Sequence, residues 1–209
     1  MIKKENLQDL YPLSPMQESI LYHALLKPDS PAYHEQVIYH ISGPINVRVM
    51  EKAWQILFER HEVLRTVFVF EKVKRPLQAV LRQANVEFAY HDMRHFSADE
   101  QQSALKKLNQ TDYANSFDLN NGPLMRMSVS QLNNETFVIL WSLHHIIMDG
   151  WCVGLLLHEF THIYIALQNN ESAFLPAPPT YSRYIQWVEQ QNQEMAKNYW
   201  KKSLAGYHQ

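Results

Sequence analysis

Apolar residues follow two patterns that alternate along this chain, and the alternation limits the folds that it can adopt. Stretches with apolar residues every three or four positions predict helices, and short runs rich in β-branched and aromatic residues predict strands. Helices are predicted over 14–26, from Asn46 onward, and over 97–111, 150–167 and 181–204; strands are predicted over 35–42, 66–70, 77–81, 86–91, 124–132 and 136–143. This order predicts an α/β chain (an α+β sandwich) with a mixed sheet flanked by helices.

Local signals mark several of the element boundaries. Ser14 followed by Pro15 favours a helix start, because serine caps the first turn and proline is tolerated in it. Ser97 and Glu100 form a capping-box pattern. A proline-rich break at 176–179 precedes the last helical region, and no long linker divides the chain. One compact unit is the simplest expectation.

Composition and charge exclude several classes of function. The net charge is −2 and the basic residues are scattered, so nucleic-acid binding is not expected. The single cysteine, Cys152, excludes an internal disulfide or a multi-cysteine metal site and favours a reducing cytoplasm. The first ten residues lack the apolar stretch of a signal peptide, and the apolar runs are too short to span a bilayer. We therefore expect a cytoplasmic chain without a membrane partner.

The segment WSLHHIIMDGW, residues 141–151, is where chemistry is expected. It lies where a predicted strand ends and a helix begins, an edge that can hold a reactive group rigidly and leave it accessible. The side chains of His144 and His145 should point to opposite faces of an extended backbone. An imidazole that faces an amine can accept its proton or orient it. Asp149 could shape the loop, and Gly150 would permit a turn or a close backbone approach.

Two other readings of this segment stay open from the residues alone. The histidines and the aspartate could ligate a metal, although adjacent histidines on a strand diverge and the helical His-Glu-x-x-His pattern is absent. They could also be two core histidines and a capping aspartate without function, because short motifs match by chance.

The motif His144-His145-x-x-x-Asp149-Gly150 resembles the signature of condensation domains from nonribosomal peptide synthetases. Four further segments resemble the motifs of that family in the same order. They are LSPMQE at 13–18, RHEVLRTVF at 60–68, FDLNNGPLMR at 117–126 and YSRYIQW at 181–187, followed by the pair Tyr199-Trp200. Five ordered motifs over nearly the whole chain are far more specific than one.

The resemblance implies a fold similar to chloramphenicol acetyltransferase, in which two lobes enclose a channel. Residues 1–179 would form the N-terminal lobe, and 180–209 a helical segment leading toward the C-terminal lobe. His145 would act on the acceptor amine as base or positioning group, and His144 would be structural.

The resemblance also implies roles for the residues around the two histidines. Asp149 would pair with an arginine, for which Arg65 is the candidate, and the role of Arg60 stays open. The Gly150 backbone N–H could face the carbonyl oxygen as charge develops on it.

The implied reaction is peptide-bond formation. The acceptor aminoacyl amine would attack a donor aminoacyl or peptidyl thioester, both carried on phosphopantetheine arms of carrier domains. The expected partners are the donor and acceptor carrier domains and the C-terminal lobe, with no directly bound cofactor and no metal. This half alone is expected to be inactive and to self-associate through the exposed lobe interface.

Related functions are the alternatives. An epimerisation domain shares the motif, but the residues after Gly150 resemble a condensation domain more closely. A heterocyclisation domain would carry aspartate in place of His144. A non-catalytic module that docks carrier proteins remains open, because condensation domains are about twice as long as this chain.

Overall fold

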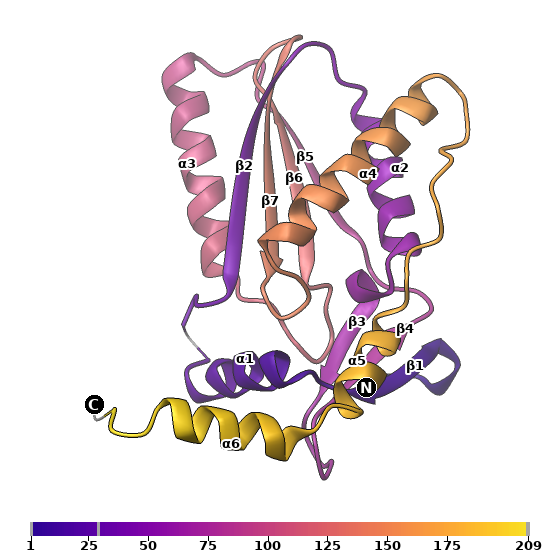
Figure 1. The fold of residues 1–209 in the computed structure, drawn as a ribbon. Coiled ribbons are helices and arrows are strands. Elements are labelled where there is room, and N and C mark those ends of the chain that lie inside the picture. Colours follow the sequence, from indigo (N-terminus) through magenta and orange to yellow (C-terminus); the bar gives the residue numbers. More distant parts are fainter. Residues whose placement is uncertain (1, 29, 208–209) are drawn as a thin grey trace.

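The computed structural model describes residues 2–28 and 30–207, and its largest element is a four-stranded mixed sheet (Figure 1). The strand order is β2-β7-β6-β5. β6 pairs antiparallel with β7, β7 pairs antiparallel with β2, and β5 runs parallel to β6. The strands are β2 (His34–Ser42), β7 (Thr136–His144), β6 (Met125–Gln131) and β5 (Glu87–Asp92). The predicted hairpin of 124–132 with 136–143 is confirmed.

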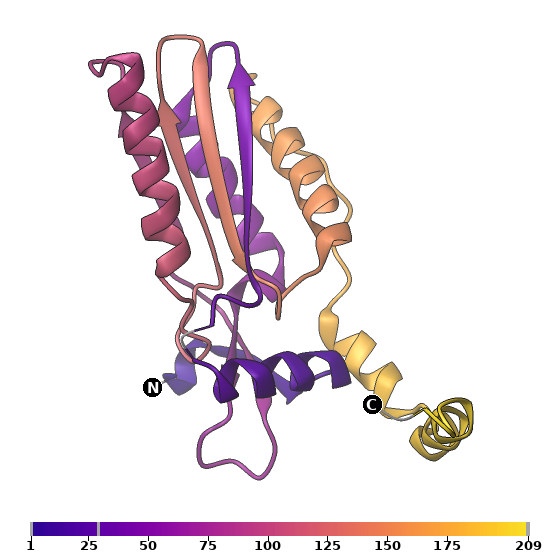
Figure 2. The ribbon, with the colours of Figure 1, turned by 90° about the vertical axis from the view of Figure 1, so that its left-hand side faces the viewer.

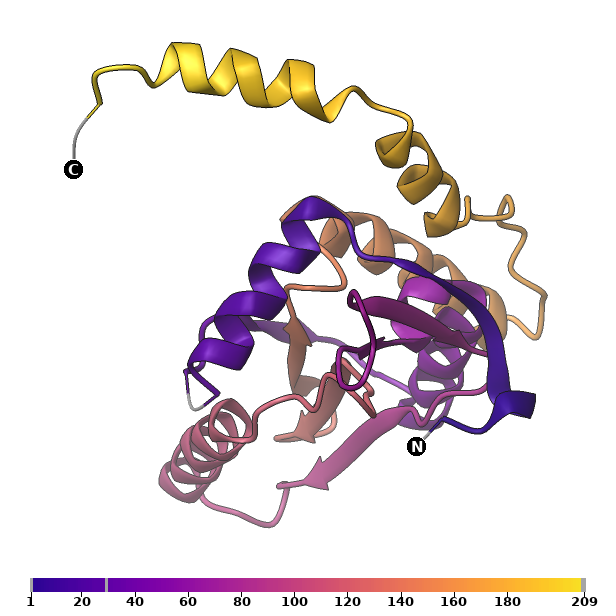
Figure 3. The same ribbon diagram turned by 90° about the horizontal axis from the view of Figure 1, so that it is seen from below.

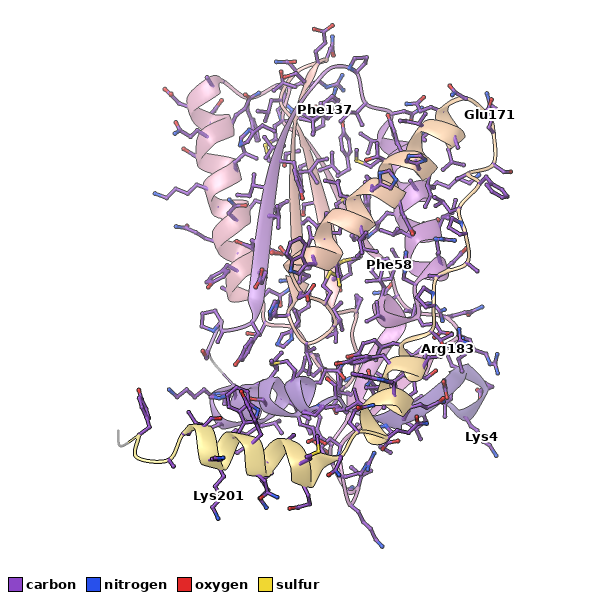
Figure 4. All side chains as sticks on the ribbon, in the orientation of Figure 1. Lys4, Phe58, Phe137, Glu171, Arg183 and Lys201 are labelled. Atoms are coloured by element: carbon purple, nitrogen blue, oxygen red, sulfur yellow. The ribbon has the colours of Figure 1, made fainter. Side chains whose placement is uncertain are left out.

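Helices cover both faces of this sheet, as predicted. α3 (Ala98–Ala114) lies on one face, and α2 (Val47–Arg60) and α4 (Gly150–Gln168) lie on the other (Figure 2). The core is on the α2/α4 face, where the indole rings of Trp54 and Trp141 meet edge to face at 5.4 Å. Figure 4 labels Phe58 on α2 and Phe137 on β7, which are both fully buried in this core.

A second, three-stranded sheet lies beyond one end of the first, next to the N-terminal helix (Figure 1). Its order is β1-β4-β3, and both pairings are antiparallel. Its strands and neighbours are β1 (Leu7–Pro12), β4 (Leu77–Leu81), β3 (Thr66–Val69), α1 (Pro15–Leu26), and the short helices η1 (Lys4–Asn6) and η2 (Glu62–Arg65). The sequence did not predict β1, because its LQDLYP segment lacks a run of strand-forming residues.

The C-terminal region forms two helices where one helical region was predicted over 181–204. Three residues separate α5 (Tyr181–Glu189) from α6 (Gln193–Ser203), and the Asn192 side chain caps α6 by accepting a hydrogen bond from the Met195 N–H. α5 contacts β1, and α6 continues away from the sheets, as the view from below shows (Figure 3). Residues 208 and 209 of the predicted terminal segment lie outside the described residues, as do 1 and 29 of the predicted lobe.

α4 is the one described helix long and apolar enough to cross a membrane by length and composition alone. This is weak evidence, because the core helix of a globular domain can meet the same criterion.

Candidate active site

His144 is the last residue of β7, and His145 follows it directly, as predicted. The side chain of His144 points to the α3 face together with its cross-strand neighbour His34. His145 belongs to the opposite face, which β7 shares with α2 and α4. One peptide bond therefore separates a buried imidazole from a partly exposed one.

His144 is buried, with 6% of its surface exposed. Its Nδ1 accepts a hydrogen bond from the backbone N–H of Ile146 at 3.2 Å. Burial, with smaller contributions from His34 and His145, lowers the pKa of His144 to about 4. The ring is therefore neutral near pH 7, and its bond to Ile146 shapes the loop after the strand. These contacts support the structural role implied for His144.

The side chain of His145 is 32% exposed, and two residues at the start of β2 lie against it, Tyr33 just before the strand and Glu35 within it. Its backbone N–H donates to the carbonyl oxygen of Tyr33 at 2.7 Å. The Tyr33 ring lies nearly parallel to the imidazole, with 6.5 Å between the ring centroids. Nδ1 of His145 lies 3.3 Å from Oε1 of Glu35. The imidazole is thus fixed in position without being enclosed.

The loop between the histidines and α4 is anchored by a residue of the first motif. Gln17 in α1 is buried, and its side-chain Nε2 donates to the carbonyl oxygen of Ile146 at 3.2 Å. The same amide also exchanges hydrogen bonds with Gln78 of β4. The first motif and the His144–Gly150 motif therefore meet through a buried polar contact, which also connects the two sheets.

Asp149 is exposed and forms the N-cap of α4. Its Oδ1 accepts a hydrogen bond from the Cys152 N–H at 3.1 Å. Hydrogen bonds from the Cys152 side chain and backbone lower the pKa of the Asp149 carboxyl, so it is ionised near pH 7. This negative charge also interacts favourably with the positive end of the α4 dipole.

The predicted pairing of Asp149 with Arg65 is wrong for the described chain. Arg65 is buried, and its guanidinium donates to the carbonyl oxygens of Phe58, Glu59 and Leu81 and to the side chain of Gln8. These acceptors occupy the guanidinium, while the Asp149 carboxylate caps a helix. Arg65 therefore supports the fold below the site by joining α2, β4 and β1.

Gly150 is the first residue of α4, and its φ is not in the left-handed region. The turn suggested as a reason for glycine here is therefore not required. Apart from its chain neighbours and the backbone of its own helix, a Cβ added at Gly150 would meet no atom of the described residues within 4 Å. The glycine leaves open space at the helix N-terminus, beside the loop that carries His145.

Replacing Asp149 with alanine is expected to cost about 1 kcal/mol of unfolding free energy, the usual effect of losing an N-cap. A buried ion pair would cost about 3–5 kcal/mol, so the magnitude separates the two roles. Urea unfolding of Asp149→Ala, with Asp149→Asn as the capping-competent control, measures it. A loss of 3 kcal/mol or more would show that Asp149 has a buried partner after all.

Arg60 forms an ion-pair cluster that fastens α2 to α4. Its Nε lies 2.7 Å from Oε2 of Glu159, and Nε2 of His61 lies 2.7 Å from the same oxygen. Arg60 also donates to the carbonyl oxygen of Pro176. Since the Arg60 side chain is only 15% exposed, it is not a solvated helix end.

Three of the matched motifs meet around one apolar pocket of about 480 Å³ next to this cluster. Its lining comes from the second motif, from the loop and first turns of α4, and from the start of α5: Arg60, His61, Glu62, Val63, Ile147, Met148, Cys152, Leu155, Leu156, Pro178, Pro179, Thr180, Tyr181, Arg183 and Tyr184. Burial raises the pKa of the Cys152 thiol at its wall, so this cysteine is not an activated nucleophile.

A buried polar network lies on the other face of β7, beside His144. The Asp112 carboxylate of α3 receives Arg126 Nε at 2.6 Å, Gln36 Nε2 at 2.8 Å and the Ser142 hydroxyl. His34 Nε2 lies 3.7 Å away. Burial would raise the pKa of Asp112, but the nearby His34 ring and the hydrogen bonds from Arg126, Ser142 and Gln36 outweigh it and hold the pKa well below its usual range. The network fixes α3 to three strands.

The alternative hypothesis, that the two histidines and Asp149 ligate a metal, finds no support in the part of the chain that the structure describes. No group of three or more histidine, cysteine, aspartate or glutamate side chains there could hold a metal ion.

Sequence reasoning missed several residues that build the site. Glu35 could have been found from the register of β2 against β7, which puts it on the same face as His145. Gln17 stood in a matched motif without an assigned role. Asp112 gave no signal, because one aspartate in a polar helix looks like a solvated residue.

The family model for the condensation domain matches residues 7–209. The chain belongs to the condensation domain family. Gramicidin S synthase 2 of Brevibacillus brevis is 37% identical over 207 residues, which are 99% of this chain and 5% of that protein. Surfactin synthase subunit 3 of Bacillus subtilis (strain 168) is 36% identical over 204 residues, 98% of this chain and 16% of that protein. This condensation-domain chain therefore spans a small part of these relatives.

Solved condensation domains share the fold. The starter condensation domain of rhizomide synthetase RzmA superposes with a TM-score of 0.83 at 23% identity, over 97% of this chain and 49% of that one. The first condensation domain of the CDA synthetase gives a TM-score of 0.81 at 18% identity, over 98% of this chain and 51% of that one. The predicted fold class is confirmed, and the condensation-domain chain covers about half of these solved chains.

Proposed function

We propose that this chain supplies the histidine-bearing lobe of an enzyme that forms peptide bonds in nonribosomal peptide synthesis. The observation that carries the proposal is His145, held at the end of β7 by Tyr33 and Glu35 with a third of its side chain exposed. Membership of the condensation domain family and similarity to peptide synthetases support the same reaction.

The reaction joins two chains carried as thioesters on phosphopantetheine arms. The acceptor amine attacks the donor carbonyl carbon, a C–N bond forms, and the C–S bond breaks to release the donor arm as a thiol. His145 orients the amine or accepts its proton, and the proton ends on the leaving sulfur. Because both reactants are tethered, much of the rate gain comes from their proximity.

The N-terminus of α4 can stabilise the oxygen that gains charge in this reaction. Gly150 begins the helix beside open space, and its backbone N–H, which is not the group that Asp149 caps, can donate a hydrogen bond to that oxygen. Neutral His144 keeps the loop in shape without adding a charge of its own.

The proposed partners are the donor and acceptor carrier domains and a C-terminal lobe. Large apolar side chains remain exposed on α4 and on the two last helices, where a lobe could cover them: Trp151, Leu155, Tyr184, Trp187, Tyr199 and Trp200. An exposed face of this kind favours association, with a second lobe or between copies of the chain. We propose that residues 180–209 lead toward that lobe, and that the chain works in the cytoplasm.

The test is a single-turnover assay with both loaded carrier proteins, using the chain joined to a C-terminal condensation lobe. His145→Ala is expected to slow amide formation by about 10²–10⁴-fold, the range for removing a general acid–base group. His158→Ala, which removes an exposed histidine of α4, is the matched control and should keep the rate.

The outcomes separate the candidate functions. Unchanged amide formation by His145→Ala would contradict the proposed role of this ring. Tight binding of loaded carriers with no amide formed by the two-lobed protein would identify a docking module. Racemisation of a carrier-bound residue without joining would identify an epimerisation domain. Amide formation by this chain as a verified monomer would contradict the need for a second lobe.

A further inference from the structure

We propose that Glu35 is a positioning residue that holds the His145 imidazole in the tautomer protonated at Nδ1. Nε2 is then left with its lone pair toward the acceptor amine. The inference rests on the proposed function, because it assigns a role to the same ring. It deepens that function by naming the group that sets the ring's chemistry.

The register of the two strands brings Glu35 to this ring. His34 lies opposite His144, and Glu35 lies opposite Leu143. Since side chains alternate along a strand, Glu35 and Leu143 occupy the face that carries His145, and His34 and His144 occupy the other. Oε1 of Glu35 reaches to 3.3 Å from Nδ1 of His145.

Nδ1 of His145 needs a partner, because it is shielded from solvent and makes no aligned hydrogen bond in the described structure. An unsatisfied buried N–H is costly, and Glu35 is the acidic group that lies at ion-pair distance from it. The contact lacks the alignment of a full hydrogen bond, but the Glu35 side chain is 49% exposed and can rotate to complete it. Catalytic hydrogen bonds often tighten in this way when substrate binds.

Tyr33 lies beside the ring and restricts its orientation. The Tyr33 carbonyl oxygen holds the His145 backbone N–H, and its aromatic ring lies 9° from parallel to the imidazole. The side chain of His145 is 32% exposed while Nδ1 is buried, so the accessible surface belongs to the rest of the ring.

A carboxylate at Nδ1 decides which nitrogen carries the proton of a neutral imidazole. Glu35 accepts a hydrogen bond and cannot donate one when ionised, so it favours Nδ1–H and leaves Nε2 as an acceptor. In the opposite tautomer, Nε2 would present an N–H to the amine and could not take its proton. The arrangement has the logic of the aspartate that orients the histidine of a serine protease.

Nitrogen-15 NMR of the imidazoles of this chain, at about pH 8 where an ordinary histidine is neutral, tests the tautomer directly. His145→Gln identifies the His145 signals. The unchanged chain should show mainly Nδ1–H at His145, and Glu35→Leu should shift the tautomer ratio about fivefold or more toward Nε2–H. Glu35→Gln keeps an acceptor oxygen without the charge and should shift the ratio less. Glu51→Leu, which removes an exposed glutamate of α2, is the control and should change nothing.

A His145 ring that is mainly Nε2–H in the unchanged chain, or a tautomer ratio that Glu35→Leu leaves unchanged, would overturn the inference.

Kinetics of the two-lobed enzyme distinguish a failure of this inference from a failure of the proposed function. There, Glu35→Leu should lower kcat about tenfold with little change in KM, and Glu35→Gln should recover part of it. If the tautomer shifts but His145→Ala keeps full activity, Glu35 positions the ring and the proposed role of His145 in amide formation fails. If His145→Ala is inactive but the tautomer does not respond to Glu35, only the positioning role fails.

Discussion

Asp112→Ala is expected to lower the free energy of unfolding by about 3–5 kcal/mol, the usual effect of breaking a buried ion pair. The carboxylate is 11% exposed and holds Arg126, whose side chain is 12% exposed. Without it, the guanidinium loses its ion-pair partner, and Ser142 and Gln36 lose a shared acceptor. Urea unfolding measures the loss.

Two further measurements define the cause. Asp99→Ala, on an exposed position of the first turn of the same helix, should cost less than about 1 kcal/mol. The pKa of Asp112 is held below its usual range, so its contribution is fully present above about pH 4 and is lost as the pH falls through the folded-state pKa. Asp112→Asn should therefore weaken the fall in stability below about pH 4. A stability that is equal in Asp112→Ala and Asp99→Ala would show that the network contributes nothing.

Arg65→Met is expected to cost about 3 kcal/mol, because several buried carbonyl oxygens lose their donor together. The carbonyl groups of Phe58 and Glu59 lie in the last turn of α2, and the carbonyl group of Leu81 lies at the last residue of β4. Methionine fills a similar volume, so packing changes little. The loss of unfolding free energy therefore measures the contribution of the hydrogen bonds.

Arg65→Lys should recover less than half of that loss, because one ammonium group cannot reach acceptors on three elements. Arg48→Met, on the exposed side of α2, is the control and should leave the urea midpoint within about 0.5 kcal/mol of the original. If Arg65→Met affected amide formation in a two-lobed enzyme but not stability, the arginine would belong to the site rather than to its support.

The residues predicted most of the elements and the position of the site, for reasons that are local. A few neighbouring residues are enough to indicate the capping box at Ser97, the break at Pro176 and the strand before His144. The split into two sheets and the strand β1 depend on pairing between distant segments, which a single sequence does not show.

Partners of buried charged groups were the least predictable part of the site. Arg65 was expected to pair with an acidic side chain, but backbone carbonyls that only the fold assembles are its main acceptors. Asp149 was expected inside such a pair and instead caps α4. The contact of Glu35 with His145 requires the register of β2 against β7, which periodicity alone does not give.

The register of β7 determines both which histidine faces α2 and α4 and how stable the fold is. A slip of one residue in this strand would turn His145 toward α3 and His144 toward α2 and α4, since every side chain would exchange faces. The slipped strand would also move Ser142 away from Asp112 and leave that carboxylate without one of its donors. A chain that turns His144 instead of His145 toward α2 and α4 is thus also less stable. The cellular systems that remove unfolded protein would therefore remove it.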